Sequence, residues 1–194
     1  EILLLNDNNY HTYGTELFNG DLLKVTDVSE EIIAQSAPVI NENGKREVVN
    51  IHFRSIKFRI PNCDKEISCF IIDSLLNSID RDLSFIETRA LYINFVIRFN
   101  ENQKKRKKEN LPTFKVGSKE FKDALRIDPF YNALKVKYGY AITCHKAQGG
   151  EWQKVFVDYS GNVSLKTNPL KWCYTATTRA IETLYAINPP LFST

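Results

Sequence analysis

The sequence of 194 residues has no methionine and few cysteines. Because methionine is missing even at position 1, we expect the chain to be cut from a longer protein, with further chemistry upstream. The four cysteines include no C-x-x-C pair, and their spacing matches no zinc pattern. We therefore expect no metal site and reduced thiols, as in cytosolic proteins, at Cys63, Cys69, Cys144 and Cys173.

Long apolar runs are also missing. The N-terminus "EILLLNDNNY" has an apolar run of only four residues and no basic region, which is not typical of a secretory signal. No segment approaches the roughly 20 apolar residues that span a bilayer, so we expect no membrane partner. With 43% hydrophobic and 25% charged residues, the chain suits one or two globular domains. Its net charge of +3 permits a polyanionic partner without requiring one.

The first 72 residues contain several strand candidates. They are Ile2–Leu5, the end of "LFNGDLLKVTDV" (17–28), one or two strands in 46–60, and "EISCFII" (66–72). Asn19-Gly20-Asp21 and "NENGK" (41–45) read as turns. This pattern predicts a small antiparallel unit over 15–72, for which an SH3-like β-barrel is the natural architecture.

The periodicity then changes to that of helices. Apolar spacing predicts helices over about 73–80 and 84–103, and a short helix lies in the linker that follows. We assign 73–133 to a helical segment and linker. The basic run 104–108, "KKRKK", has two interpretations: a solvated helix end or mobile loop, and a patch that contacts phosphates.

From residue 134 onward the sequence alternates between strand and helix patterns. Strands are predicted over 134–143, 154–159 and 183–188, and a helix over 169–181. This order predicts a βαβαβ unit with a parallel sheet, in which ligands bind at the carboxyl ends of the strands. We assign 1–14 and 134–194 to this α/β domain and treat 15–72 as an insertion.

Polar residues gather in "YGYAITCHKAQGGEW" (138–152). Thr143 and His145 follow a predicted strand, where side chains and backbone N–H groups can face a phosphate, and Lys146 adds positive charge. Gln148 and Glu151 offer an amide and a carboxylate for a nucleotide. Glycine at 149 and 150 permits tight turning. Composition alone leaves an ordinary structural turn equally open.

The predicted helix 169–181 carries "WCYTATTRA" (172–180). Thr175 and Arg179 share one face of it. An arginine near a helix C-terminus is ordinarily a solvated side chain that complements the helix dipole. Beside a nucleotide it can instead act as an arginine finger, neutralising charge on a transferring γ-phosphoryl group.

The two blocks together resemble the C-terminal motor domain of superfamily-one DNA helicases, most closely the RecD-like and Dda-like 5′-to-3′ branch. "YAITCHKAQGGEW" is similar to motif V of that family and "CYTATTRA" to motif VI, in the right order and spacing. A weaker likeness joins "FNGDLLKV" (18–25) to the segment that opens the β-barrel insert of these helicases. Residues 73–135 resemble nothing we can name.

The resemblance implies a RecA-like domain of the P-loop NTPase fold. It implies contacts to single-stranded DNA by Thr143, His145 and Lys146, and to ATP by Gln148, Gly149, Glu151 and Arg179, with Arg179 as the catalytic residue. No G-x-x-x-x-G-K-[ST] loop occurs among the eight glycines. ATP and Mg²⁺ would therefore be held mainly by an upstream RecA-like partner domain of the parent chain.

On this interpretation the chain is a helicase part, inactive alone, in the bacterial cytoplasm or nucleoid. Its β-barrel insert can serve as a docking module for a protein partner. The alternative is a nucleic-acid-binding module without turnover.

Overall fold

The computed structural model describes residues 1–41, 43–60, 65–160 and 168–189. It divides the chain into two compact units, residues 1–140 (unit 1) and residues 141–194 (unit 2). The domain boundaries expected after residues 14, 72 and 133 do not coincide with this division. Cys63 lies outside the described residues, and the other three cysteines are free thiols. No helix in the described ranges has the length and hydropathy needed to cross a bilayer.

Unit 1 is built on one antiparallel sheet. Its strands are β1 (Ile2–Leu5), β2 (Leu22–Ile40), β3 (Arg46–Arg59), β4 (Glu66–Ile72) and β5 (Val136–Tyr138). They are ordered β4-β3-β2-β1-β5, and every neighbouring pair is antiparallel. The described residues between β2 and β3 agree with the predicted turn, since the Gly44 N–H donates to the Asn41 carbonyl and Gly44 has a φ of +74°; residue 42 lies outside the described residues.

Three helices accompany this sheet: α1 (Asp73–Leu76), α2 (Phe85–Lys108) and α3 (Lys119–Ile127). Ser84 caps α2, since its hydroxyl accepts the Glu87 N–H while the Glu87 carboxylate accepts the Ser84 N–H. Ser118 caps α3 in the simpler way, through the Phe121 N–H. The second helix was predicted to end near residue 103, but α2 continues through the whole basic run.

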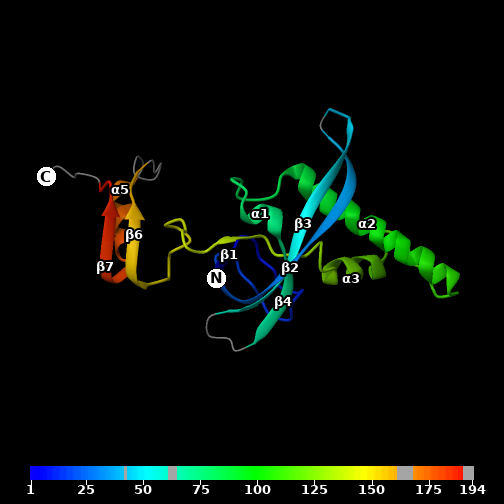
Figure 1. The fold of residues 1–194 in the computed structure, drawn as a ribbon, viewed down its shortest axis with the longest axis horizontal. Helices are drawn as coiled ribbons and strands as arrows, with labels where there is room; N and C mark the ends of the chain where they lie inside the picture. The colour runs from blue at the N-terminus through cyan, green and yellow to red at the C-terminus, as the bar shows by residue number, and fades with distance from the viewer. Residues whose placement is uncertain (42, 61–64, 161–167, 190–194) are drawn as a thin grey trace. The chain divides into compact units, whose positions relative to one another are not determined.

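Strands β2 and β3 form a long two-stranded ribbon (Figure 1), and its buried side chains belong to two apolar clusters. Ile56 and Phe58 of β3 are buried in the first cluster, together with β1 and β5. Ile51 and Phe53, nearer the start of β3, are buried in the second cluster. The buried positions of β3 thus change from odd-numbered to even-numbered residues between residues 53 and 56. This change lies opposite extra residues in β2, where the pairing shifts register between Val28 and Ile32.

The first cluster surrounds β1 and β5 and includes Leu3, Leu5 and Val136. The second packs the outer ribbon against α2 through residues that include Leu91. A third, aromatic cluster joins α2 to α3; its buried members are Phe95, Phe99 and Phe121. The described apolar interior of unit 1 therefore comprises three clusters, from the sheet to the helical pair.

Two expectations about sheet architecture need correction. The structure shows no SH3-like barrel confined to 15–72, because β2, β3 and β4 need β1 and β5 from outside that range to complete their apolar cluster. Likewise β1 and residues 134–140 do not belong to a parallel sheet. Strand β1 is a central strand, flanked by β2 and β5, and Ile2 is its only exposed residue. Its apolar run Ile2–Leu5 therefore suits a central position in an antiparallel sheet.

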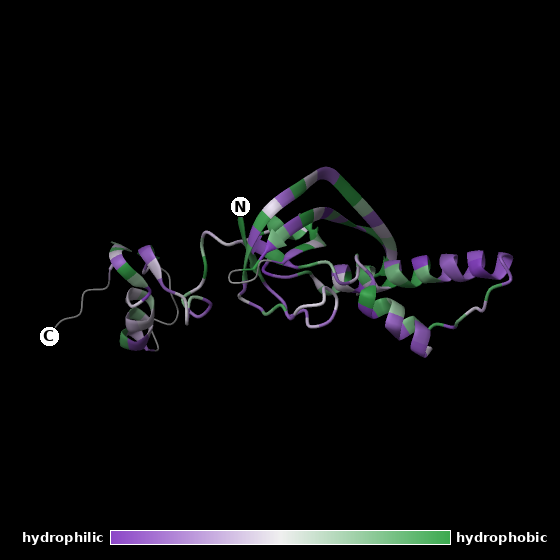
Figure 2. Cartoon of the chain, turned by 90° about the horizontal axis from the view of Figure 1, so that it is seen from below, coloured by the Kyte–Doolittle hydropathy of each residue, from purple (hydrophilic) through white to green (hydrophobic). Residues whose placement is uncertain are grey.

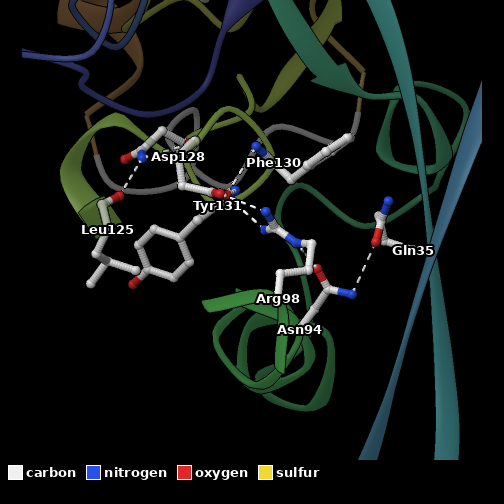
Figure 3. Close-up of polar contacts among 8 residues, drawn as sticks. Gln35, Asn94, Arg98, Leu125, Asp128, Phe130 and Tyr131 are labelled. Carbon is white, nitrogen blue, oxygen red and sulfur yellow. Dashed lines mark hydrogen bonds and ion pairs between the residues drawn. The ribbon is translucent and has the colours of Figure 1, made fainter. Parts of the chain in front are cut away.

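A polar network holds α2 to the segment after α3 (Figure 3). Arg98 donates two hydrogen bonds to the Asp128 carboxylate, at 2.6 and 2.8 Å. The same carboxylate accepts the backbone N–H groups of Phe130 and Tyr131. The Arg98 guanidinium also lies 5.1 Å from the Phe130 ring centre, while Asn94 donates to Gln35 on β2.

Unit 2 contains β6 (Trp152–Asp158), α5 (Pro169–Thr177) and β7 (Ala180–Ile187). β6 and β7 are parallel, and α5 connects them and packs on one face (Figure 1). The small core consists of Val157, Tyr159, Trp172 and Ala176. The predicted strand–helix–strand order is confirmed here. The larger RecA-like sheet is not shown, since the described sheet of unit 2 has these two strands.

Candidate nucleotide and nucleic-acid interface

Residues 141–150 form a series of turns that leads into β6. The Ala147 N–H donates to the Thr143 carbonyl at 3.0 Å, and the Gly150 N–H donates to the Ala147 carbonyl at 3.1 Å. The N–H groups of Lys146 and Gln148 also bond within the loop. These four N–H groups are therefore engaged within the loop.

The side chains predicted to bind DNA or nucleotide lie along this loop. Thr143, His145, Gln148 and Glu151 are exposed, whereas Lys146 is half-buried. Gly149 has a φ of +84°, a conformation that suits glycine and explains its place in the turn. The strand before this loop is β5, which is antiparallel to β1. These residues therefore do not follow the end of a parallel strand, as the sequence had suggested.

Arg179 connects this loop to the start of β7. Its guanidinium donates to the Thr175 carbonyl from Nε, to the Gly150 carbonyl from Nη1 and to the Thr178 hydroxyl from Nη2, each at 2.9 Å. The Arg179 carbonyl in turn accepts the Trp152 N–H at 2.9 Å. The structure thus brings the end of the first motif block into contact with the arginine of the second.

The partners of Arg179 are all neutral oxygens. Within the described part of the chain, no carboxylate forms an ion pair with it. An arginine has five N–H donors, so two remain beyond the three bonds above. Its positive charge is oriented but not neutralised, which is the state required of a group that meets an anionic ligand.

A thiol nucleophile at Cys144 is not supported by its surroundings. Burial raises the pKa of the Cys144 thiol above its ordinary value, and the opposing effect of Arg179 is smaller. The Cys144 Sγ lies 3.8 Å from the Trp172 carbonyl. Cys144 therefore acts as a packing residue beside the unit 2 core.

The two tryptophans have different environments. Trp172 is 8% exposed and packs edge-to-face on Tyr159 in the core of unit 2. Trp152 is half-buried and its ring covers Gly150. A Cβ on Gly150 would lie 2.4 Å from Trp152 Cη2, so the ring leaves room for glycine alone.

Comparison with known protein families bears on this part of the chain. Residues 138–187 match the UvrD-like helicase C-terminal domain. This match supports a superfamily-one helicase C-terminal domain and suggests a helicase-related function with nucleic-acid binding. The helicase match contains the whole loop 141–150, β6, α5, Arg179 and β7.

A second comparison reaches beyond the helicase match. The chain is 26% identical over 198 residues to "Uncharacterized protein R530" of Acanthamoeba polyphaga mimivirus. The similarity covers 91% of this chain but 39% of the viral protein, so the chain spans about two fifths of that relative's length. Unit 1 is therefore included in the similarity, together with the helicase-like unit 2.

Metal ligands are not gathered in the described ranges, where no group of three or more His, Cys, Asp or Glu side chains is placed to hold a metal ion. Neither loop 141–150 nor the surroundings of Arg179 supplies such a set.

The sequence did not indicate the partners of Arg179. The shared face of Thr175 and Arg179 was expected from their spacing, and the structure shows that the bond goes to the Thr175 carbonyl. The sequence cannot mark the Gly150 carbonyl as a partner, because every residue has a backbone carbonyl. Only the pairing of β6 with β7 brings it beside Arg179.

Proposed function

We propose that this chain is the C-terminal motor part of an ATP-dependent DNA helicase of the RecD-like or Dda-like branch. In this function an upstream RecA-like domain of the parent protein holds ATP and Mg²⁺. Arg179 reaches the γ-phosphate, and Gln148, Gly149 and Glu151 lie near the nucleotide. Thr143, His145 and Lys146 contact the backbone of single-stranded DNA.

The observation that carries this proposal is the state of Arg179. Its guanidinium is held in one orientation by neutral oxygens and keeps its full charge. Bonds from arginine to phosphate are charge-assisted and roughly twice as strong as bonds to neutral acceptors. A γ-phosphate that reaches this site can therefore displace a carbonyl acceptor and gain from the exchange.

The exchange also connects nucleotide to DNA. Because Nη1 of Arg179 holds the carbonyl at the end of loop 141–150, moving the guanidinium toward phosphate releases that end of the loop. The loop carries the proposed DNA contacts. Hydrolysis of ATP removes the phosphate that favours one arrangement, so the two arrangements alternate through the cycle.

The decisive experiment uses the full-length protein with its upstream domain and measures DNA-stimulated ATP hydrolysis. We expect Arg179→Ala to lower kcat by about 10³-fold or more, as for other arginine fingers. Arg179→Lys should also be impaired, since lysine cannot reproduce the planar fork. The affinity for single-stranded DNA should change little in both variants.

Arg89→Ala is the matched control, since Arg89 is an exposed arginine on α2. Emission from Trp152 and Trp172 reports whether unit 2 remains folded in each variant. Hydrolysis that is unchanged in a folded Arg179 variant would refute the arginine-finger role. It would favour the alternative of a nucleic-acid-binding module without turnover.

A further inference from the structure

The outer end of the α2–α3 pair has a larger net positive charge than the whole chain. Residues 98–126 contain ten Lys and Arg against four Asp and Glu, a net charge of +6, whereas the whole chain has +3. Figure 2 shows the outer turns of α2 as hydrophilic. The rest of the chain is therefore net acidic, and the excess of basic charge belongs to this one place.

The basic residues at the end of α2 divide into two faces. Arg106 points toward the segment between α2 and α3, where its Nε donates to the Pro112 carbonyl and its guanidinium lies 5.3 Å from the Phe114 ring centre. At about 100° per residue, the four lysines occupy an arc of about 160° centred opposite Arg106. We call this arc the lysine face; it consists of Lys104, Lys105, Lys107 and Lys108.

The lysine face is not neutralised by the protein. All four side chains are exposed, and none forms an ion pair with a residue that the structure describes. Glu101 and Glu109 lie nearby on α2 and at its C-cap, and they leave a clear positive excess. The helix dipole favours cations in the last turn, but that effect does not require five consecutive ones, which repel each other.

We propose that the lysine face binds the phosphate backbone of duplex DNA, at a site separate from loop 141–150. The choice of DNA as the polyanion rests on the proposed helicase function, whereas the existence of a polyanion site rests on the charge alone. Duplex DNA presents one charge per roughly 1.7 Å of axis, twice the density of one strand. A rigid helix that displays four ammonium groups within two turns matches that density.

The chemistry of the same face argues against single-stranded DNA. Sites for single strands combine basic groups with aromatic side chains on which bases stack. Phe95, Phe99 and Phe121 are buried in the cluster between α2 and α3, and the half-buried Phe114 ring packs against that cluster and lies beside Arg106, on the side away from the lysine face. The lysine face thus provides charge without stacking, which suits a backbone whose bases are already paired.

The test compares two triple variants of the full-length protein with equal charge loss. One replaces Lys104, Lys105 and Lys108 by glutamine, and the other replaces the exposed Lys24, Lys45 and Lys65 of unit 1. Affinity for a blunt 20-base-pair duplex and for one of its strands is measured by fluorescence anisotropy at several salt concentrations. Far-ultraviolet circular dichroism verifies that α2 is retained.

For duplex DNA we expect the first variant to reduce the slope of log K against log salt by about 2.7, since each lost phosphate contact contributes about 0.9. The control should retain the parental slope, and binding of the single strand should be equal in both variants. Equal duplex slopes in the two variants would overturn the proposal and leave an acidic protein partner as the occupant. An equal loss for single strand and duplex would overturn the choice of duplex DNA.

ATP hydrolysis stimulated by single-stranded DNA separates this proposal from the helicase function. If the parental protein hydrolyses no ATP, the proposed function fails, while the comparison of duplex slopes still decides the role of the lysine face.

Discussion

Replacing Asp128 by alanine should destabilise unit 1 more than any surface change. Asp128 is 8% exposed, and its carboxylate accepts bonds from Arg98 and from the backbone N–H groups of Phe130 and Tyr131. Breaking a buried ion pair from one side costs about 3–5 kcal/mol, because the remaining charge has no partner. The Arg98 side chain is 27% exposed, so water relieves part of this cost and we expect about 3 kcal/mol.

Urea denaturation followed by circular dichroism at 222 nm measures the effect, since the described helices lie mainly in unit 1. With a slope of about 2 kcal/mol per molar urea, the midpoint should fall by about 1.5 M. Asp27→Ala is the matched control: Asp27 pairs with Lys57 at 3.0 Å, but both side chains are largely exposed. If the two variants shift the midpoint equally, the reasoning about burial is refuted.

The double replacement Arg98→Met with Asp128→Leu sharpens the test. It removes both charges and keeps apolar volume between α2 and the segment after α3. Since an apolar pair is often no worse than a buried ion pair, the double variant should be more stable than Asp128→Ala alone. A double variant that is less stable than the single one would show that the network contributes more than charge compensation.

Two further predictions concern single side chains. In a Trp172→Phe background, where Trp152 is the remaining tryptophan, Gly150→Ser should displace the Trp152 ring and shift its emission to the red. The same change should destabilise unit 2 by about 1–3 kcal/mol. Unchanged emission would contradict the close contact. Burial raises the pKa of Cys69 to about 12, so with rising pH the thiol ionises in the unfolded chain before it ionises in the folded one. The contribution of Cys69 to the free energy of unfolding is therefore fully present below pH 9 and is lost as the pH rises toward 12. We expect a loss of about 1 kcal/mol between pH 9 and pH 10 in urea titrations, and Cys69→Val should reduce it; an identical loss in that variant would rule Cys69 out as its source.

Local patterns predicted local elements well. Ile2–Leu5 and Glu66–Ile72 are strands with the predicted bounds, and a short helix follows α2 as expected. The segment 46–60 was predicted as one or two strands because its alternation breaks. The structure explains the break, since β3 is one strand that serves a different cluster on each side of residues 54 and 55.

Pairing between distant strands was not predictable in the same way. An apolar run such as Ile2–Leu5 suits the middle of a parallel sheet and of an antiparallel one equally, and only the partners decide. The end of α2 was placed too early because the apolar spacing that predicted the helix does not continue into the basic run. In the structure that run continues the helix, with Arg106 anchored to the segment after it.

The candidate site shows the same division. Side chains that carry chemistry, such as His145 and Arg179, could be named from their motifs. The acceptors that orient Arg179 are mostly backbone carbonyls, and these become neighbours only when β6 and β7 pair. Residue identity therefore suggested the candidate site residues, whereas the partners that orient Arg179 could be found only from the fold.

The irregular pairing between Val28 and Ile32 determines where the chain can change length. Where β2 is regularly paired, adding or deleting one residue would move its buried side chains to the exposed face along the rest of the strand. Ala37 and Val39 would then turn from α2 into water. Insertions and deletions among related sequences should therefore concentrate at residues 29–31 and at the other register shift, between Val25 and Asp27, where the strand pairing is already irregular.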